Sequence, residues 1–268
     1  MDLKKLLELA IHASLQSSEE ILKIYNTPFE VDYKDDKSPV TIADKNASKV
    51  IENILSVSQL PFLSEEGKHT DYDIRKKWDA YWLVDPLDGT KEFIKKNGEF
   101  TVNIALIQNQ APILGVIYCP VSRDLYFAAK DLGAYKLNVQ VATDGTHPTD
   151  LDSMIQHSSK LPDSVSSVYT IVASRSHLST ETYQRIEEMK LKHPDLSIVN
   201  VGSSLKLCLI AEGKANEYPR FGPTMEWDIA AGHAILLESG ANVIDHSTQE
   251  QMKYNKADLL NNWFIAKR

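Results

Sequence analysis

Four short apolar segments follow one another in the middle of the chain, and this run constrains the possible folds more than any other feature. They cover residues 101–108, 113–119, 125–129 and 134–141. Each resembles a strand because it is rich in β-branched and aromatic residues and is bounded by turn-forming ones. The connections are short, and consecutive strands joined in this way pair antiparallel. We therefore expect a four-stranded meander.

Helical spacing of apolar residues marks the segments that precede the meander. Residues 3–25 repeat Leu, Ile and Ala at intervals of three and four, which predicts an amphipathic helix or a pair of helices. Residues 35–39 form a polar break that ends in a proline and predict a loop. A second helix follows, because Thr41 and Asp44 have the spacing of a capping box. The first half is thus expected to be an α+β unit.

The second half alternates strands and helices instead. Strands are expected at 168–173, 197–201, 215–218, 241–245 and 259–266, and helices at 179–192, 203–212 and 228–239. Alternating units favour a layered α/β arrangement. The pattern changes near residues 143–150, where turn-forming residues gather, so we expect two domains, 1–145 and 146–268.

Charge narrows the classes of partner. The 268 residues include 29 Lys and Arg against 37 Asp and Glu, a formal net charge of −8. Nucleic-acid polymers are held by a surplus of cationic residues, so this class of partner is not expected. Small phosphorylated molecules stay open, because divalent cations held by carboxylates can bind phosphate.

The compartment is indicated by two cysteines and by the shortness of the apolar runs. Cys119 and Cys208 form neither a disulfide framework nor a zinc pattern, so we expect a cytoplasmic protein. Glu8 interrupts the first apolar stretch, and no run approaches about 18 apolar residues. Neither a signal peptide nor a transmembrane segment is therefore expected. Peripheral association with the cytoplasmic side of the inner membrane stays open.

The strongest local feature is the sequence Asp-Pro-Leu-Asp-Gly-Thr at residues 85–90, directly after an apolar strand. Asp85 and Asp88 flank a proline turn and can face one point, with the carbonyl of Leu87 turned the same way. Oxygen ligands of this kind suit Mg²⁺. Gly89 and Thr90 would begin a helix, whose free amides suit a phosphate. Metal and phosphate sites are therefore expected side by side.

Each acidic residue taken alone is more often a turn or a helix cap than a metal ligand. This alternative applies to Asp88, and also to Glu65 after a strand, Asp228 at a helix start and Asp44 in its capping box. Bringing Asp85, Asp88, Glu65 and Asp228 together costs on the order of 4 kcal/mol for each pair at about 4 Å and an effective dielectric of about 20. Such a cluster would therefore need cations.

Three segments carry a resemblance to a known family. They are Glu65-Glu66, the 85–90 segment, and Trp227-Asp228 followed by small residues up to Gly232. In these residues the chain resembles the inositol monophosphatase superfamily of Mg²⁺-dependent, lithium-sensitive phosphatases. The resemblance implies a mixed α and β fold, a layered αβαβα sandwich of the inositol monophosphatase type.

Within the superfamily the chain is most similar to the 3′(2′),5′-bisphosphate nucleotidases, with matching segments along nearly its whole length. The resemblance implies an enzyme of sulfur metabolism that hydrolyses adenosine 3′,5′-bisphosphate (PAP) to AMP and phosphate. The sulfated analogue PAPS, which would give APS, is a second substrate to consider. Two alternatives stay open: an inositol or sugar monophosphatase with the same metal site, and a non-catalytic nucleotide or metal sensor.

The resemblance also implies roles for individual residues at the metals. Two or three Mg²⁺ ions are expected. A first ion would be held by Glu65, Asp85 and the Leu87 carbonyl, and a second by Asp85, Asp88 and Asp228. A third, weaker ion would be held by Glu65 and water.

Catalytic and substrate-binding roles follow from the same resemblance. Asp44 and Thr90 would orient and deprotonate the attacking water. His177 would lie near the adenine, and Ser203, Lys206 and Arg220 would surround the second phosphate. Further substrate contacts are implied for Glu65, Leu87, Asp88, Gly89, Thr90 and Asp228.

Structural alternatives exist for two of these residues, and one residue departs from the family pattern. Lys206 could be an exposed helix position, and His177 could cap a turn. Glu226 stands where relatives can carry an apolar residue, and we expect it to alter the rim of the substrate pocket.

Overall fold

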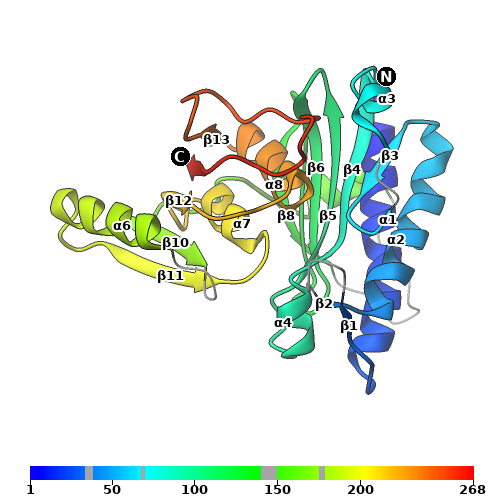
Figure 1. The fold of residues 1–268 in the computed structure, drawn as a ribbon, viewed down its shortest axis with the longest axis horizontal. Coiled ribbons are helices and arrows are strands. Elements are labelled where there is room, and N and C mark those ends of the chain that lie inside the picture. The colour runs from blue at the N-terminus through cyan, green and yellow to red at the C-terminus, as the bar shows by residue number, and fades with distance from the viewer. Residues whose placement is uncertain (34–38, 68–69, 140–149, 175–178) are drawn as a thin grey trace.

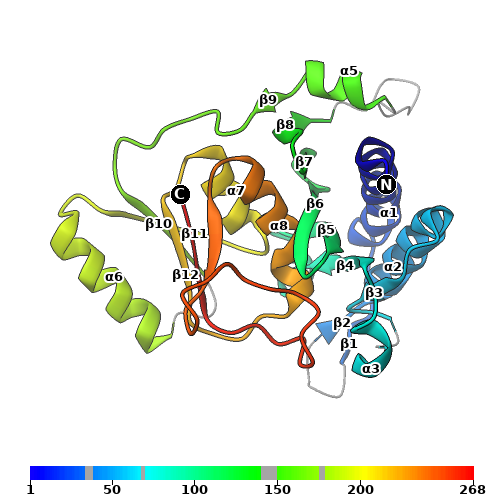
Figure 2. The ribbon, with the colours of Figure 1, turned by 90° about the horizontal axis from the view of Figure 1, so that it is seen from above.

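The computed structural model describes residues 1–33, 39–67, 70–139, 150–174 and 179–268. Its elements form five layers: two helices, a seven-stranded sheet, two further helices, a five-stranded sheet and an outer helix (Figures 1 and 2). The expected αβαβα sandwich is therefore confirmed.

The first sheet contains the predicted meander. Its strands are β3 (Phe62–Ser64), β4 (Ala80–Asp88), β5 (Thr101–Gln108), β6 (Ala111–Cys119), β7 (Asp124–Ala129), β8 (Gly133–Asn138) and β9 (Ser159–Lys160), in this order. β3 is parallel to β4, and every later pair is antiparallel. Because β9 pairs with β8, the first sheet extends past the predicted domain boundary at residue 145.

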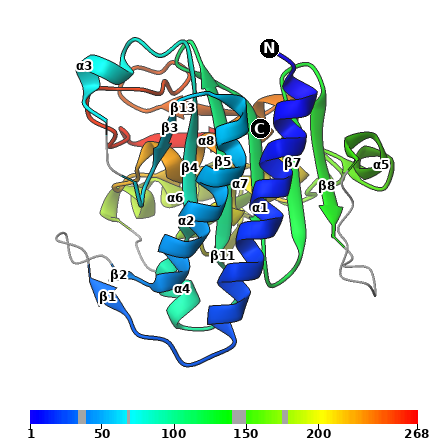
Figure 3. The ribbon, with the colours of Figure 1, turned by 90° about the vertical axis from the view of Figure 1, so that its right-hand side faces the viewer.

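Two helices cover the outer face of this sheet (Figure 3). α1 (Leu3–Tyr25) is one continuous helix, and its apolar stripe packs against α2 (Ile42–Leu55) and the sheet. α2 begins with the predicted capping box: the Thr41 backbone N–H donates to Asp44 Oδ2 across 2.8 Å. Capping fixes where α2 begins, and this places Asp44 at the end of the sheet that carries the site.

The second sheet has the order β11 (Ser197–Val201), β10 (Thr170–Ser174), β12 (Glu217–Arg220), β14 (Phe264–Lys267) and β13 (Asn242–Asp245). α6 (Thr180–Lys192) lies on its outer side, and α7 (Leu205–Glu212) and α8 (Glu226–Glu238) lie between the two sheets (Figure 2). The alternating elements predicted for this half are confirmed. The last strand is shorter than the predicted 259–266, because Leu260 instead forms an isolated bridge with Met225.

Close packing of α8 on the first sheet depends on a glycine. A Cβ on Gly115 of β6 would lie 2.2 Å from the Ala231 carbonyl oxygen, far inside van der Waals contact. α8 is consequently buried on nearly all sides, and the helix start that carries Asp228 is held against the end of β4.

Several short elements were not expected. They are β1 (Asp32–Tyr33), β2 (Pro39–Val40), the 3₁₀ turn Ser56–Ser58, α3 (Tyr72–Arg75) and α5 (Leu151–Gln156). Elements of two to six residues are too short to show a period. α4 (Thr90–Ile94), in contrast, begins where a helix was expected, at Gly89 and Thr90. The predicted loop at 35–39 lies mostly outside the described residues, and Pro39 pairs within β2.

Two further expectations concern the cysteines and the membrane. Cys119 and Cys208 are both buried and unpaired, and burial raises the pKa of each thiol, so neither suits a nucleophile. Throughout the described ranges, no helix has the length and apolar character needed to cross a membrane.

Candidate active site

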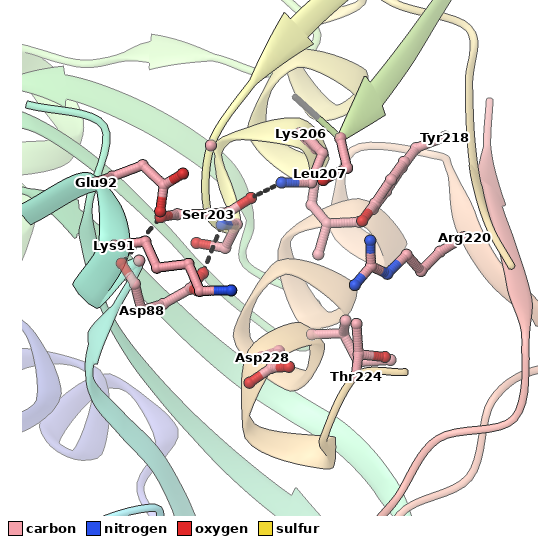
Figure 4. A pocket seen from close by; sticks show the side chains of 15 residues that line it. Asp88, Lys91, Glu92, Ser203, Lys206, Leu207, Tyr218, Arg220, Thr224 and Asp228 are labelled. Carbon is pink, nitrogen blue, oxygen red and sulfur yellow. Dashed lines mark hydrogen bonds between the residues drawn. The ribbon is translucent and has the colours of Figure 1, made fainter. Parts of the chain in front are cut away.

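Two adjoining cavities lie between the end of β4, the end of β12 and the start of α8. The larger, of about 490 Å³, contains the predicted metal ligands. The smaller, of about 160 Å³, extends toward α7 (Figure 4). Asp88, Lys91, Arg220 and Asp228 line both, so the two cavities form one continuous site.

Two of the predicted metal-binding carboxylates, Asp85 and Asp88, lie at the end of β4. The pairing of β4 with β5 is interrupted between Asp85 and Asp88, where the chain bulges. Inside this bulge the Leu87 N–H donates to Asp85 Oδ1 across 3.0 Å. Asp85 is 1% exposed, and burial together with Glu65, Asp88 and Asp228 raises its pKa well above the usual value. A buried carboxylate so close to other carboxylates is costly unless a cation joins it.

Asp88 is held by donors from the second half of the chain. Its Oδ2 accepts the Ser204 N–H across 2.6 Å and lies 3.4 Å from Asn103 Nδ2. Burial raises the pKa of Asp88 to about 6, while Lys206 and the Ser204 amide act in the opposite direction. Asp88 therefore joins the two halves of the site.

Glu65 and Asp228 complete the acidic side. Glu65 follows β3, and its N–H donates to the Val84 carbonyl across 3.2 Å, beside Asp85. Asp228 lies in the first turn of α8, where its Oδ2 accepts the Met225 N–H across 2.9 Å. Burial, Asp88 and Glu65 raise the pKa of Asp228 well above its usual value. The four predicted carboxylates thus lie around one cavity and repel one another.

The donor set fits Mg²⁺ chemically. Carboxylate and carbonyl oxygens are hard ligands, and the mutual repulsion of the carboxylates is what a divalent cation relieves. Among the described residues, no group of three or more Asp, Glu, His or Cys side chains is arranged closely enough to hold a metal ion without other ligands. An ion here would therefore depend on further oxygen ligands, from the Leu87 carbonyl, water or a phosphate.

Asp44 and Thr90 also lie together, as predicted. The Thr90 hydroxyl donates to Asp44 Oδ1 across 3.2 Å, and the Thr41 hydroxyl donates to Asp44 Oδ2 across 2.7 Å. Asp44 is 2% exposed, and burial raises its pKa although Thr41 acts against this. Thr90 lines the acidic cavity, and Asp44 lies behind it; the catalytic roles of the two residues stay a prediction.

Gly89 permits the close approach of the two halves. Its φ of +95° is left-handed, and a Cβ there would lie 2.1 Å from Ser203 Oγ. The Ser203 hydroxyl, 2.9 Å from the Asp88 carbonyl and 2.7 Å from that of Glu99, is thus engaged with the backbone of the first half. This contact gives Ser203 a structural role in addition to its predicted contact with phosphate.

The opposite wall of the site is cationic. Lys206 is 8% exposed, so it is not the exposed helix position that was the alternative. Its Nζ donates to the Ser203 carbonyl across 2.6 Å and lies 5.6 Å from the Tyr218 ring centroid. Burial lowers its pKa to about 8, against the opposing effect of Asp88. Arg220 Nη2 donates to the Pro223 carbonyl, and its buried Nε has no hydrogen-bond partner among the described residues. Both cations face Asp88 and Asp228 across the cavity (Figure 4).

One predicted site residue cannot be placed, and others were missed. His177 lies outside the described residues. Several residues that line the smaller cavity were not singled out, among them Lys91, Tyr218 and Thr224. Lys91 directly follows the 85–90 segment, and Tyr218 and Thr224 flank Arg220, so neighbourhood in the sequence was the available signal. Ser204 directly follows the predicted Ser203, but Asn103 carries no such signal, because only folding brings it to Asp88.

Comparison with known proteins agrees with this site. The model of the inositol monophosphatase family matches residues 2–267, so the chain belongs to that family.

Within this family, the chain is similar to several proteins that carry the name CysQ. It is 44% identical over 244 residues to "3'(2'),5'-bisphosphate nucleotidase CysQ" of Salmonella typhimurium, covering 90% of each chain. With the protein of the same name from Escherichia coli K12 the identity is 45%, covering 85% of this chain and 86% of the relative. The crystal structure of CysQ from Bacteroides thetaiotaomicron superposes with a TM-score of 0.89 at 49% identity, covering 98% of this chain and 97% of that one. The SuhB protein of Bartonella henselae, at 24% identity and a TM-score of 0.72, shares the fold (97% and 92% coverage).

Proposed function

We propose that this chain is a Mg²⁺-dependent 3′(2′),5′-bisphosphate nucleotidase that hydrolyses PAP to AMP and phosphate. PAPS, which would yield APS, is a second substrate to test. The relatives that share 44–45% of their residues with the chain carry the name of this activity.

The observation that carries the proposal is the opposition of charges across one site. Asp88 and Asp228 lie on one side, and Lys206 and Arg220 lie on the other (Figure 4). Asp85 lines the adjoining larger cavity together with Asp88 and Asp228. A nucleoside bisphosphate has two phosphates, and only one of them is cleaved. The two cations, of which Lys206 is buried, suit the phosphate that stays, and the carboxylates suit the one that leaves, through Mg²⁺.

The residues around the larger cavity would hold two or three Mg²⁺ ions: Glu65, Asp85, the Leu87 carbonyl, Asp88 and Asp228. When bound, the ions would neutralise the phosphate, stabilise the leaving oxygen and acidify a water. Direct titration with Mg²⁺ tests this part, because an ion that relieves the carboxylate repulsion raises the melting temperature.

The remaining chemistry belongs to the chain. Asp44 accepts hydrogen bonds from Thr41 and Thr90, so the Thr90 hydroxyl is oriented with its oxygen free to accept from a water. A proton passed from that water to Thr90 can move on to Asp44, whose raised pKa favours acceptance. Tyr218 and Leu207 line the cationic side and keep water from the second phosphate.

Side-by-side assays separate the proposal from its rivals. We expect Mg²⁺-dependent release of phosphate from PAP with a kcat/KM at least about 100-fold above that for inositol 1-phosphate, since each charge-assisted contact contributes about 1.5–3 kcal/mol. Faster turnover of inositol 1-phosphate would support the monophosphatase instead. Tight PAP binding without turnover in saturating Mg²⁺ would support the sensor.

We further propose that the enzyme acts in the cytoplasm and is sensitive to lithium. Two buried, unpaired cysteines suit a reducing compartment. Cell fractionation tests the location, and a pellet that retains the protein after a salt wash would indicate association with the inner membrane. Li⁺ at millimolar concentration should inhibit PAP hydrolysis if it occupies a Mg²⁺ position.

A further inference from the structure

Glu226 is a fully buried carboxylate at the first position of α8. It was expected at the rim of the substrate pocket, but it lines neither cavity of the site. Its side chain instead points into the segment that returns from β13 toward β14. The expectation was wrong because sequence position alone does not show on which side of the helix start the side chain leaves.

Three donors from two consecutive residues satisfy this carboxylate. Glu226 Oε2 accepts the Asn255 N–H across 2.7 Å, and Oε1 accepts the Lys256 N–H across 3.0 Å. Lys256 Nζ completes an ion pair at 2.6 Å from Oε1. A buried charge is tolerated when it is paired and hydrogen-bonded in this way, so the contacts hold the segment firmly to α8.

The same segment is held from its other side by a second buried charge. Arg75, 3% exposed, donates from Nη1 to Asn255 Oδ1 and from Nη2 to the Ala257 carbonyl, both across 2.8 Å. Asn255 Nδ2 returns a hydrogen bond to the Arg75 carbonyl. We call Arg75, Glu226, Asn255 and Lys256 the Glu226 brace. It ties α3 of the first half to the start of α8.

The brace continues directly into the site. Lys256 Nζ lies 3.3 Å from Asn261 Oδ1, and Asn261 Nδ2 donates to the Met225 carbonyl across 2.7 Å. Met225 bridges to Leu260, and its own N–H donates to Asp228 Oδ2. Both Met225 and Leu260 line the larger cavity. Between Glu226 and the metal-ligand candidate Asp228 there is thus an unbroken set of hydrogen bonds.

We propose that Glu226 is a positioning residue: through Lys256 and the 255–261 segment it fixes the start of α8, and with it the orientation of Asp228 toward Mg²⁺. The inference rests on the proposed function, because it takes Asp228 as a ligand. The carboxylate of Glu226 touches neither substrate nor the cavity, so its effect on the site is indirect.

Removing the charge of Glu226 or of Lys256 should loosen the contact between the 255–261 segment and the start of α8. In Glu226→Gln the side chain keeps its shape but loses one acceptor, and its amide N–H₂ then opposes a backbone N–H. In Lys256→Met the carboxylate stays but loses its cation, and Asn261 loses a donor. Lys256→Arg retains the charge and is the conservative variant. The exposed pair Lys253–Glu250, 3.2 Å apart in the same region, supplies a matched control, Glu250→Gln.

The experiment measures Mg²⁺ binding by thermal-shift titration, amide hydrogen exchange across residues 224–232, and kcat and KM for PAP. We expect Glu226→Gln and Lys256→Met to raise the Mg²⁺ concentration for half-saturation on the order of 10-fold, the range seen for groups that orient metal ligands. Amides 225–230 should exchange faster, and kcat should fall at limiting Mg²⁺ while the KM for PAP at saturating Mg²⁺ stays within about twofold. Lys256→Arg and Glu250→Gln should behave as the wild type.

The proposal is overturned if a folded Glu226→Gln variant binds Mg²⁺ as the wild type does, even with a lower melting temperature. Should Glu226→Gln fail to fold, Lys256→Met, whose side chain is 27% exposed in the wild type, decides by the same readouts. A wild-type chain that binds Mg²⁺ without hydrolysing PAP would refute the proposed function, while exchange and Mg²⁺ titration would still test the brace.

Discussion

The Thr90 hydroxyl donates to Asp44 Oδ1 across 3.2 Å, although the two residues lie 46 positions apart in the chain. Asp44 is fixed by the capping box of α2, and Thr90 is the first residue of α4. The pair therefore joins the outer helical layer to the end of β4, and its Thr90 lines the acidic cavity. Its geometry predicts how substitutions at either residue behave.

Asp44→Asn and Thr90→Val should each lower kcat for PAP by about 10²–10⁴, since both break the same proton path. The KM for PAP and the half-saturating Mg²⁺ concentration should change little. The double variant should be about as slow as the slower single variant, because the two residues act as a unit. Steady-state kinetics checks this, with Asp73→Asn, an exposed carboxylate of α3, as control. Additive losses would show that the residues act independently.

Lys206→Met should reduce selectivity for bisphosphates. We expect kcat/KM for PAP to fall by about 10- to 150-fold, the equivalent of a charge-assisted contact of about 1.5–3 kcal/mol. Turnover of a monophosphate that lacks the second phosphate should fall much less. Lys190→Met removes an exposed lysine that pairs with Glu187 and serves as the control. Equal losses on both kinds of substrate would show that Lys206 acts on the carboxylates and not on the second phosphate.

Gly89→Ala should impair both folding and activity. Its left-handed backbone is strained for any other residue, and the added Cβ would collide with Ser203 Oγ. We expect a loss of about 1–3 kcal/mol in the free energy of unfolding, measured by urea denaturation. In Gly89→Ala/Ser203→Gly the collision is removed and part of the loss should return. Stability equal to that of the wild type in the single variant would contradict the close approach of the two halves.

Local sequence patterns predicted the meander, the alternating second half and the two carboxylates at the end of β4, because each lies within a short segment, whereas the full sandwich and the set of metal ligands were implied by the family resemblance. The meander shows a strand period, and the 85–90 segment places Asp85 and Asp88 at a strand end without any long-range information. The hydrogen bonds that hold the site residues in place, in contrast, join segments that lie far apart in the sequence. Ser204 reaches Asp88 from 116 positions away, and the direction of the Glu226 side chain depends on a segment about 30 positions later. Elements such as β9 and α3 are fixed by their neighbours in space, which the sequence does not show.

His233 should make the stability of the protein depend on pH. It is fully buried in α8, with Nε2 2.9 Å from Asn242 Oδ1 and Nδ1 2.9 Å from the Tyr254 hydroxyl. Asn242 Oδ1 also accepts the Val243 N–H, so it is an acceptor. Nε2 therefore carries the ring proton, and Tyr254 donates to Nδ1. Burial lowers the pKa of His233 to about 4, against an ordinary value of 6.5.

Between these two values the unfolded chain binds a proton at this position and the folded chain does not. Stability from His233 is therefore complete above pH 6.5 and is lost as the pH falls toward about 4, by about 1.4 kcal/mol per pH unit and about 3 kcal/mol in total. The buried carboxylates of the site have raised pKa values and act in the opposite direction, so the wild-type curve alone does not isolate the effect of His233.

The difference in free energy of unfolding between the wild type and His233→Gln, measured by urea denaturation from pH 7.5 to pH 4, cancels the contribution of these carboxylates. This difference should shrink or reverse by about 3 kcal/mol over the range. A constant difference for His233→Gln would mean that His233 binds its proton equally well in the folded and the unfolded chain, and would contradict the lowered pKa.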